Sequence, residues 1–230
     1  MQIIALGGRG FTSGSRDAAL DRYVLAQSGK RRPRVCFVPT ASGDSAASMR
    51  RVAAAIKRHG GIPSTLSLFA PPVGSLSTYL CRHDVIFVGG GNTRNLLALW
   101  KLWGLDKAMR KAYERGIILS GVSAGAICWF QAGLTDSWTG KYRELDALGW
   151  LRGSFSPHFD SEPRRRATYR RLIRNGTMPG GYGVDDGVAL HFVDGRLARA
   201  VSSRPRAQAL EIRRRGDRLI ETALEIKRLP

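Results

Sequence analysis

Two kinds of segment alternate along the chain up to about residue 160. Short runs of mostly apolar residues, rich in Val, Ile and Phe, are typical of strands. Longer stretches between them have apolar residues at helical spacing. This alternation predicts βαβ units built around a mostly parallel sheet. The predicted strands are Gln2–Leu6, Arg34–Pro39, Thr65–Phe69, Asp84–Val88, Ile117–Gly121 and Ser154–Pro157.

The helices predicted between these strands are Asp17–Ala26, Ser45–Arg58, Thr93–Trp103 and Asp106–Arg115. In the second of them, Met49, Val52 and Ile56 fall three or four positions apart, so they share one helical face. A further helix is expected to begin at Ser161-Glu162-Pro163. There a hydroxyl N-cap precedes an acidic residue and a proline, and the proline needs no N–H partner in a first turn.

From Gly180 onward the pattern changes to short, closely spaced strands. These are Val184–Asp186, Val188–Val193, Leu197–Ser202, Ala207–Arg213 and Arg218–Glu225. Asp194-Gly195 and Arg215-Gly216-Asp217 fall between them, as is typical of hairpin turns. The predicted fold class is therefore α/β: a three-layer α/β/α sandwich with a mostly parallel central sheet and an antiparallel C-terminal portion. Because no repeat, low-complexity tract or linker interrupts residues 1–230, we expect a single domain.

The composition adds a strongly basic charge, with 37 Lys and Arg against 18 Asp and Glu and a formal net charge of +19. Such an excess is common in proteins that bind nucleic acid. Here the basic residues are mostly arginines spread along the chain, which indicates a compositional bias rather than a dedicated binding face. We expect no specific nucleic-acid partner, only nonspecific binding that weakens as salt rises.

The sequence gives little support for a membrane protein or for a metal site. No stretch approaches about 18 uncharged apolar residues, so no membrane partner is expected, and the N-terminus reads as a buried strand rather than a signal peptide. The three cysteines, Cys36, Cys81 and Cys128, are odd in number and form no Cys-x-x-Cys pair. We therefore expect a cytoplasmic protein with no metal site, no disulfide framework and no cofactor.

The strongest chemical signal is Gly121-Val122-Ser123-Ala124-Gly125. It follows an apolar strand and precedes a predicted helix that begins at Ala124. This is the context of a nucleophile elbow, in which a strained turn exposes the central side chain and leaves room only for small residues on either side. The N–H groups at the start of the following helix favour developing negative charge. The motif predicts that Ser123 is a nucleophile.

A serine hydroxyl needs a base, and His158 is the best candidate. It ends a predicted strand, and catalytic groups of open α/β sheets gather at the carboxyl ends of strands. Structural roles are expected for His59, His83 and His191. A carboxylate should orient the imidazole, and both Asp136 and Asp186 lie at suitable turns. The sequence leaves these two carboxylates as open alternatives.

Acyl transfer also needs donors for an oxyanion. The segment Gly89-Gly90-Gly91-Asn92-Thr93 connects a strand to a helix and can present bare backbone N–H groups, to act with the N–H of Ala124. Glycine-rich turns also bind phosphates. However, the chain has no Gly-Lys-Ser/Thr, and Arg94 occupies the third glycine position of Gly-x-Gly-x-x-Gly. The loop Gly7-Gly8-Arg9-Gly10 also lacks that fingerprint.

Together, the glycine loop, the serine elbow and Ser156-Pro157-His158-Phe159 resemble the peptidase E family of serine peptidases (S51), which includes the cyanophycinases. The motifs fall in the family's order at similar spacing, and the resemblance covers most of the chain. It implies a fold like that of class I glutamine amidotransferase domains, with serine in place of their cysteine. It also implies Ser123 as nucleophile, His158 as base, and Gly90 or Gly91 with Ala124 as oxyanion donors.

The resemblance implies a serine peptidase that cleaves short peptides through an acyl-enzyme, with Asp-X dipeptides as the first substrate class. The substrate-binding candidates are Asn92 and Thr93 in the glycine loop and Arg165 and Arg166 beyond His158, because an arginine can pair with an aspartate side chain. A monomer or a homodimer is expected. One alternative is a cyanophycinase-like hydrolase of β-aspartyl-arginine. The other is a noncatalytic, nucleic-acid-binding relative.

Overall fold

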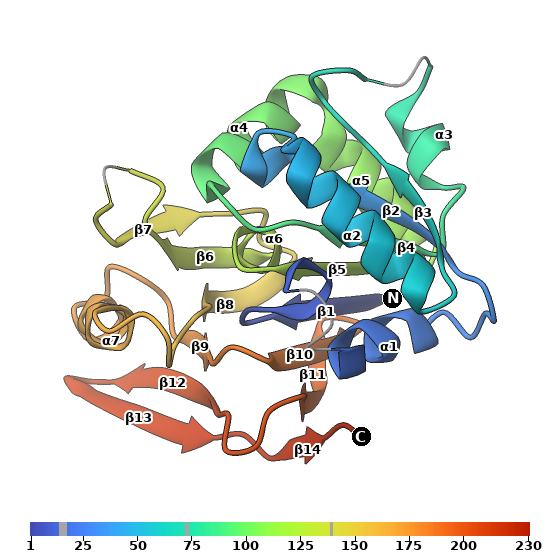
Figure 1. The fold of residues 1–230 in the computed structure, drawn as a ribbon. Coiled ribbons are helices and arrows are strands. Elements are labelled where there is room, and N and C mark those ends of the chain that lie inside the picture. Colours follow the sequence, from blue (N-terminus) through green and yellow to red (C-terminus); the bar gives the residue numbers. More distant parts are fainter. Residues whose placement is uncertain (14–17, 72–73, 139) are drawn as a thin grey trace.

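The computed structural model describes residues 1–13, 18–71, 74–138 and 140–230, and its strands form two sheets (Figure 1). The larger, sheet A, has eight strands in the order β14-β11-β10-β1-β5-β4-β2-β3. In chain order, these strands are β1 (Gln2–Leu6), β2 (Arg34–Val38), β3 (Ile62–Thr65), β4 (Val85–Val88), β5 (Ile118–Val122), β10 (Val188–Val193), β11 (Arg196–Ser202) and β14 (Ile226–Arg228).

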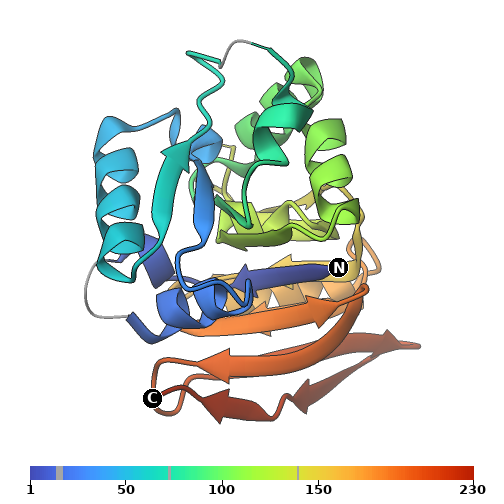
Figure 2. The same ribbon diagram turned by 90° about the vertical axis from the view of Figure 1, so that its right-hand side faces the viewer.

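The centre of sheet A is parallel and its C-terminal side is not. β1, β5, β4, β2 and β3 run parallel to one another. β10 is antiparallel to β1 on one side and to β11 on the other, and β11 is parallel to β14. Figure 2 shows these C-terminal strands, in orange and red, at the bottom of the molecule, away from most of the helices.

Sheet B has six strands in the order β13-β12-β9-β8-β6-β7. They are β6 (Phe130–Thr135), β7 (Arg143–Asp146), β8 (Leu151–Ser156), β9 (Gly181–Val184), β12 (Ala209–Arg215) and β13 (Arg218–Ala223). β6, β8 and β9 are parallel, whereas β7, β12 and β13 pair antiparallel with their neighbours.

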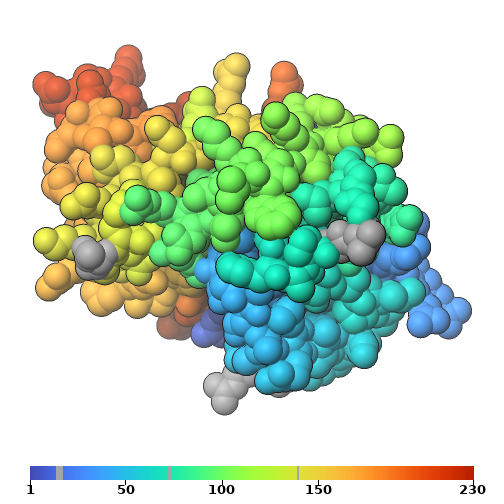
Figure 3. Space-filling view, turned by 90° about the horizontal axis from the view of Figure 1, so that it is seen from above, coloured from blue at the N-terminus to red at the C-terminus, as the bar shows by residue number. Residues whose placement is uncertain are grey.

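Helices cover both sheets. Sheet A packs on one face against α1 (Ala18–Ala26) and α2 (Ala46–Arg58). Its other face meets α3 (Leu76–Leu80), α4 (Thr93–Trp103), α5 (Leu105–Glu114), α6 (Ala124–Ile127) and part of sheet B. α7 (Arg165–Arg174) packs against sheet B. Short 3-10 turns cover Gly10–Thr12 and Thr40–Ser42. Seen from above, the N-terminal half of the chain, in blue to green, and the C-terminal half, in yellow to red, occupy different sides of the surface (Figure 3).

The side chains of β1 point alternately to the two faces of sheet A, so this strand contributes to the core on both faces. Ile4 and Leu6 belong to the core under α1 and α2, whereas Ile3 and Ala5 face the core on the opposite side, and all four are fully buried. Successive side chains of a strand point to opposite faces, so a central parallel strand must be apolar at every position. This is why the strand pattern of the first half is continuous rather than alternating.

Stacked aromatic rings join the two sheets. The rings of Phe130 on β6 and Phe155 on β8 stack with centroids 4.9 Å apart, and Phe130 meets Phe192 of β10 edge-on at 5.6 Å. All three side chains are nearly or fully buried. Aromatic pairs at these separations stabilise a core beyond the area that they bury. Sheet B is thereby anchored to the C-terminal side of sheet A.

The α/β class, the parallel centre and the antiparallel C-terminal portion are confirmed. The single central sheet becomes two sheets, because the chain after the elbow starts a second sheet at Phe130 rather than continuing as a helix. The helix from Ala124 is only four residues long. Strand Thr65–Phe69 was placed too late, since β3 ends at Thr65. The sequence pattern did not predict α3, β6, β7 or β14.

Several boundaries differ by a few residues. α7 begins at Arg165 rather than at Ser161, and its N-cap residue, Arg164, makes no side-chain capping bond. β9 ends at Val184, so Asp186 lies in the turn after it. Asp17, the first residue of a predicted helix, lies outside the described residues. The Asp194-Gly195 turn is confirmed, with positive φ at both residues, as a tight hairpin requires.

No helix in the described ranges combines the length and the apolar character that crossing a bilayer requires.

A buried histidine links stability to pH. His191 on β10 is 2% exposed and bonds the Tyr23 hydroxyl and the Gln2 side chain, at 2.7 and 2.8 Å. Burial, helped by the charge of Arg199, lowers the pKa of the His191 imidazole from 6.5 to about 4. The folded state therefore favours the neutral ring, and its contribution to stability is present above pH 6.5 and lost as pH falls towards 4.

We predict that His191→Gln flattens the pH dependence of the unfolding free energy across this window. Urea unfolding at a series of pH values between 7 and 4 measures the slope directly. The substitution also removes hydrogen bonds, but that loss is the same at every pH and leaves the slope unaffected. An unchanged slope in the variant would show that His191 is not the titrating group.

Candidate active site

Ser123 sits at the tip of a strained turn between β5 and α6. Its backbone has φ 55° and ψ −115°, a conformation that L-residues rarely adopt. Its N–H donates to the carbonyl of Leu6 at 3.2 Å, which anchors the strained residue to the end of β1. The side chain is partly exposed, whereas Val122 and Ala124 on either side of it are buried. The serine is thus presented to solvent by a buried support.

The two elbow glycines are required by close packing. A Cβ on Gly121 would lie 2.0 Å from the carbonyl oxygen of Gly125, and one on Gly125 would lie 2.3 Å from that of Val88. No side chain can be inserted at such distances without moving backbone. The prediction that only the smallest residues fit around Ser123 therefore has a direct steric cause.

His158 lies after β8 and pairs with Asp186 in the turn after β9. Its Nδ1–H donates to Asp186 Oδ1 at 2.7 Å, and the two side chains are only 24% and 18% exposed. Burial raises the pKa of the Asp186 carboxyl, but the hydrogen bond and charge of His158 outweigh it, helped by Ser161 and Arg9, and hold that pKa below its usual range. A charged Asp186 fixes the imidazole tautomer and leaves Nε2 as its basic nitrogen.

Of the two candidate acids, the structure brings only Asp186 to His158. Asp136 follows β6, is exposed, and makes no hydrogen bond to His158 within the described ranges. The sequence could not separate the two because both precede turn-forming residues. The parallel pairing of β8 with β9 brings Asp186 to His158, since it places the two strand ends side by side.

One turn holds the candidate nucleophile, base and acid together. Three consecutive carbonyls, those of Leu6, Gly7 and Gly8, accept hydrogen bonds from the N–H groups of Ser123, His158 and Gly187, at 3.2, 2.9 and 3.3 Å. Gly187 directly follows Asp186. Three segments far apart in the sequence are thus held in fixed positions by hydrogen bonds to one short stretch of backbone.

This role of Gly7-Gly8 was missed by sequence reasoning, which tested the segment only as a nucleotide loop. A Cβ on Gly8 would lie 1.9 Å from Asp186 Oδ1 and 2.9 Å from His158 Nδ1. A Cβ on Gly7 would lie 2.3 Å from the carbonyl oxygen of Asp185. The paired glycines at the end of the first strand were the available signal, because adjacent glycines there indicate close approach of other segments.

The glycine loop after β4 lies against Ser123. A Cβ on Gly90 would come within 3.2 Å of the Ser123 Cβ, and Gly91 has φ 136°, which favours glycine. Within the described part of the chain, the N–H groups of Gly90, Gly91 and Ala124 have no hydrogen-bond acceptor. They are free to donate to an anionic oxygen.

Asn92 and Thr93, both predicted to bind substrate, anchor this loop through hydrogen bonds within the protein. Asn92 caps α4 by accepting from Asn95 N–H at 2.9 Å, and its amide donates to the Ser137 carbonyl at 3.0 Å. The Thr93 side chain is buried and bonds Thr135. Ser137 also accepts the N–H of Thr93 at 2.9 Å. The glycine loop is therefore tied to the segment after β6.

Arg165, also predicted to bind substrate, has its guanidinium held within the protein. Its side chain is 3% exposed and donates to Glu162 and to the Leu134 carbonyl, both at 2.7 Å. Its guanidinium also lies over the Tyr142 ring. Glu162 in turn donates its N–H to the carbonyl of His158. Arg165 thus supports the segment that carries the base.

Arg166 remains a candidate for binding substrate. Its guanidinium lies over the ring of Phe159, the neighbour of His158, at 4.8 Å, and its side chain is 36% exposed. The nearest carboxylate oxygen is Asp185 Oδ1 at 4.0 Å, too long for a hydrogen bond. The positive charge of Arg166 is therefore only partly neutralised by Asp185.

The remaining histidines have structural partners, as expected. His83 bonds Ser64 at 2.6 Å, His191 bonds Tyr23, and His59 faces Asp21 at 3.8 Å. No cluster of three or more His, Cys, Asp or Glu side chains suited to a metal ion occurs in the residues that the structure describes.

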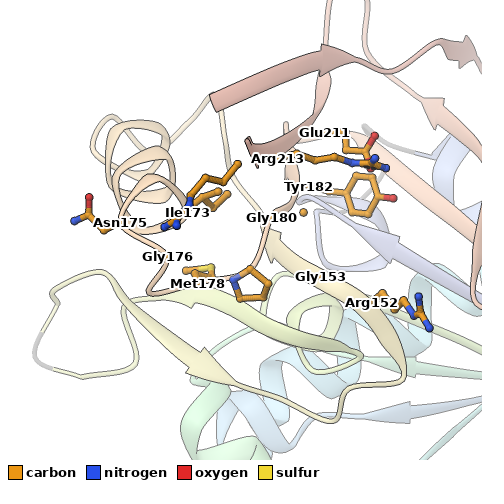
Figure 4. Close-up of a pocket in the computed structure, with 13 residues that line it drawn as sticks. Arg152, Gly153, Ile173, Asn175, Gly176, Met178, Gly180, Tyr182, Glu211 and Arg213 are labelled. Atoms are coloured by element: carbon orange, nitrogen blue, oxygen red, sulfur yellow. Dashed lines mark hydrogen bonds and ion pairs between the residues drawn. The ribbon is translucent and has the colours of Figure 1, made fainter. Parts of the chain in front are cut away.

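A cavity of about 790 Å³ lies on sheet B, away from these residues (Figure 4). Arg152 and Gly153 line it at the start of β8, and Gly181 and Tyr182 at the start of β9. His158 and Asp186 follow the opposite ends of the same strands. Since active sites of parallel sheets form at the carboxyl ends, we place the candidate site at His158 rather than in this cavity.

Comparison with known proteins identifies the family of the chain. The family model of peptidase family S51 matches residues 3–200. The chain belongs to peptidase family S51.

The relatives agree with this assignment. The chain is 48% identical to the uncharacterized peptidase YgaJ of Bacillus subtilis (strain 168) over 228 residues, 99% of either chain. It is 29% identical to the uncharacterized peptidase Lmo0363 of Listeria monocytogenes over 144 residues, 59% of this chain and 70% of that one.

Two solved structures share the fold. One is a peptidase from an acI-B1 Actinobacterium, with a TM-score of 0.70 at 16% identity, covering 97% of this chain and 94% of the other. The second, from Listeria monocytogenes EGD-e, is provisionally named a peptidase E protein. Its TM-score is 0.61 at 20% identity, covering 97% and 98% of the two chains.

For this S51 peptidase, we predict that Asp186→Asn lowers the rate of serine labelling by a fluorophosphonate by about three to four orders of magnitude. The amide keeps the shape of the side chain but no longer stabilises an imidazolium. The matched variant Asp136→Asn should label at the wild-type rate, because Asp136 is exposed and makes no bond to His158. If Asp136→Asn proves to be the slow variant, the assignment of the acid is reversed.

Proposed function

We propose that the chain is a serine peptidase that hydrolyses short peptides through Ser123, His158 and Asp186. The observation that carries the proposal is the 2.7 Å bond between His158 and Asp186, held by the same turn that anchors Ser123. A partly exposed serine in a strained elbow, with a histidine–aspartate pair held against the same turn, has little structural purpose but suits covalent catalysis. Membership of family S51 supports the same chemistry.

In the proposed reaction, Ser123 Oγ attacks the scissile carbonyl while His158 Nε2 accepts its proton. The charge of Asp186 stabilises the imidazolium that forms. His158 then gives the proton to the leaving amine, and an acyl-enzyme on Ser123 remains. Water attacks this ester with His158 again acting as base, and Ser123 is released. Nucleophile, base and acid are all supplied by this chain.

The developing oxyanion would be bound by N–H groups of the glycine loop and the elbow. A Cβ on Gly90 would lie 3.2 Å from the Ser123 Cβ, and Gly91 and Ala124 are the other proposed donors. Their N–H groups have no acceptor in the described ranges, so they are available without breaking other bonds. Preorganised donors of this kind contribute about 3 to 4 kcal/mol each to transition-state stabilisation.

We propose Asp-X dipeptides as the first substrate class. Arg166, which lies over the ring of Phe159 and is only partly neutralised by Asp185, would pair with the aspartate side chain. Arg9 is a second cation near the site, since its charge acts on Asp186. All three cysteines, each in a described segment, are free, which suits the reducing cytoplasm proposed for this peptidase.

The test of the reaction is labelling by a fluorophosphonate serine probe together with hydrolysis of a dipeptide panel. Wild type should label and cleave, and Ser123→Ala and His158→Ala should do neither. Ser77→Ala in α3 is the control, because it removes a serine hydroxyl outside the elbow, the glycine loop and the His158 segment, and it should label and cleave like wild type. Labelling that persists in Ser123→Ala would contradict the elbow assignment, and a wild type that neither labels nor cleaves would contradict the enzyme itself. Turnover of β-aspartyl-arginine in preference to Asp-X would favour a cyanophycinase-like specificity.

For substrate recognition, we predict that Arg166→Gln raises KM for Asp-X about tenfold, equivalent to about 1.4 kcal/mol, and leaves Ala-X peptides unaffected. Arg171→Gln on the same helix removes the same charge from an exposed position and serves as the control. Steady-state kinetics on both substrates measures the difference. Equal effects of Arg166→Gln on Asp-X and Ala-X would rule out a role in recognising the acidic side chain.

A further inference from the structure

Arg204 lies in the connection between β11 and β12, just beyond the residues 3–200 that the family model matches. One nitrogen of its guanidinium, Nη1, donates to Asp160 Oδ2 at 2.7 Å and to the main-chain carbonyl of Asp186 at 2.9 Å. Asp160 completes the arrangement, because its Oδ1 accepts the N–H of Asp186 at 2.9 Å. Both main-chain polar groups of Asp186 are therefore held by side chains.

These bonds connect the segment of the base to the segment of the acid. Asp160 follows His158 by two residues on the connection after β8, and Asp186 lies in the turn after β9. Arg204 comes from a third connection, and its own turn is seated on Gly187, whose carbonyl accepts the N–H of Ser203 at 2.9 Å. The guanidinium thus closes a ring of hydrogen bonds through the Asp160 side chain and the main chain of Asp186.

The Arg204 side chain packs closely against the turn after Asp186, which limits how far it can move. A Cβ on Gly187 would lie 2.7 Å from Cδ of Arg204, so the aliphatic part of the arginine lies over the turn that follows Asp186. The Arg204 side chain is 32% exposed, and that of Asp160 is 26% exposed. Both are partly withdrawn from solvent, where charge-assisted hydrogen bonds are strengthened.

The charge of Arg204 also matters, because three carboxylates gather here. Asp160, Asp185 and Asp186 belong to two adjoining segments. Burial raises the pKa of the Asp185 carboxyl, and the charge of Asp160 acts in the same direction. The hydrogen bond to Asp160, with the charges of Asp160, Asp186 and Asp185, raises the pKa of the Arg204 guanidinium. Arg204 therefore remains charged and offsets repulsion that would otherwise separate the two segments.

We infer that Arg204, acting with Asp160, is a positioning residue that fixes Asp186 at hydrogen-bonding distance from His158. It touches neither the nucleophile nor any reacting atom in the proposed reaction. Its effect is to limit the movement of the acid relative to the base, and a displacement of about 1 Å at such a site can lower the rate about a hundredfold. This inference rests on the proposed function only for its consequence in catalysis.

The kinetic test compares Arg204→Met, Arg204→Lys and Arg206→Met in the full-length protein. Arg206 is exposed, lies in the same connection and has no hydrogen bond or ion pair among the described residues, so its removal matches the change in charge. Arg204→Met should lower kcat and the rate of fluorophosphonate labelling about 10- to 100-fold, with KM within about twofold of wild type. Arg204→Lys should recover part of the rate, and Arg206→Met should match wild type.

A second measurement does not depend on activity. The His158 Nδ1 proton, hydrogen-bonded to a carboxylate, should give a strongly downfield proton resonance in NMR spectra, assigned by its loss in Asp186→Asn. It should be lost or broadened in Arg204→Met and in Asp160→Asn, and retained in Arg206→Met. Asp160→Asn keeps the side-chain shape, and so tests the same bonds if Arg204→Met proves too unstable to study.

The two proposals fail in different ways. A wild type without labelling or turnover would defeat the proposed function, yet the downfield resonance would still report whether Arg204 holds the pair. A resonance and a labelling rate in Arg204→Met equal to those of Arg206→Met would overturn the inference. So would a loss of rate caused wholly by KM, because a positioning role acts on kcat.

Discussion

The candidate active site depends on one stretch of backbone, the turn that follows the first strand. Its carbonyls at Leu6, Gly7 and Gly8 accept N–H groups from Ser123, His158 and Gly187 in the same order as those residues occur in the chain. Backbone hydrogen bonds in a buried setting are costly to leave unmade, so each of the three segments has a fixed register against this turn. The strain at Ser123 can persist because its neighbours are anchored independently.

Each sheet contributes different residues to the candidate site. Sheet A supplies the candidate nucleophile at the end of β5 and the glycine loop at the end of β4, and both of these strands are buried in its parallel centre. Sheet B supplies His158 and Asp186 at the ends of two parallel neighbours, β8 and β9. Packing of Phe130 and Phe155 against sheet A sets the relation between the sheets, and the turn after β1 joins them at the reacting end. Arg204 adds a restraint from the C-terminal side.

Local patterns in the sequence were sufficient to predict the turn at Ser123, the place of His158 after a strand and the strands of the parallel centre, because each has a short-range cause. A continuous apolar run identifies a doubly buried strand, and small residues around Ser123 identify a turn with no space for side chains. Choosing Asp186 over Asp136 required knowing that β8 pairs with β9, which is a long-range fact. The sequence could not show that Arg165 is buried and paired with Glu162, because both depend on how the segment after β8 folds. The roles of Gly8 and Arg204 also arise only when distant segments meet.

The central claim is that Ser123 and the pair His158–Asp186 are held in reacting register by the turn at Leu6–Gly8. A crystal structure of the protein after reaction with a small phosphonate tests it most directly. The account predicts phosphorus bonded to Ser123 Oγ, one phosphoryl oxygen within hydrogen-bonding distance of the N–H groups of Gly90 or Gly91 and Ala124, and His158 Nε2 beside the adduct with Asp186 still on Nδ1. An adduct on another residue, or a phosphoryl oxygen turned away from these donors with His158 out of reach, would contradict it.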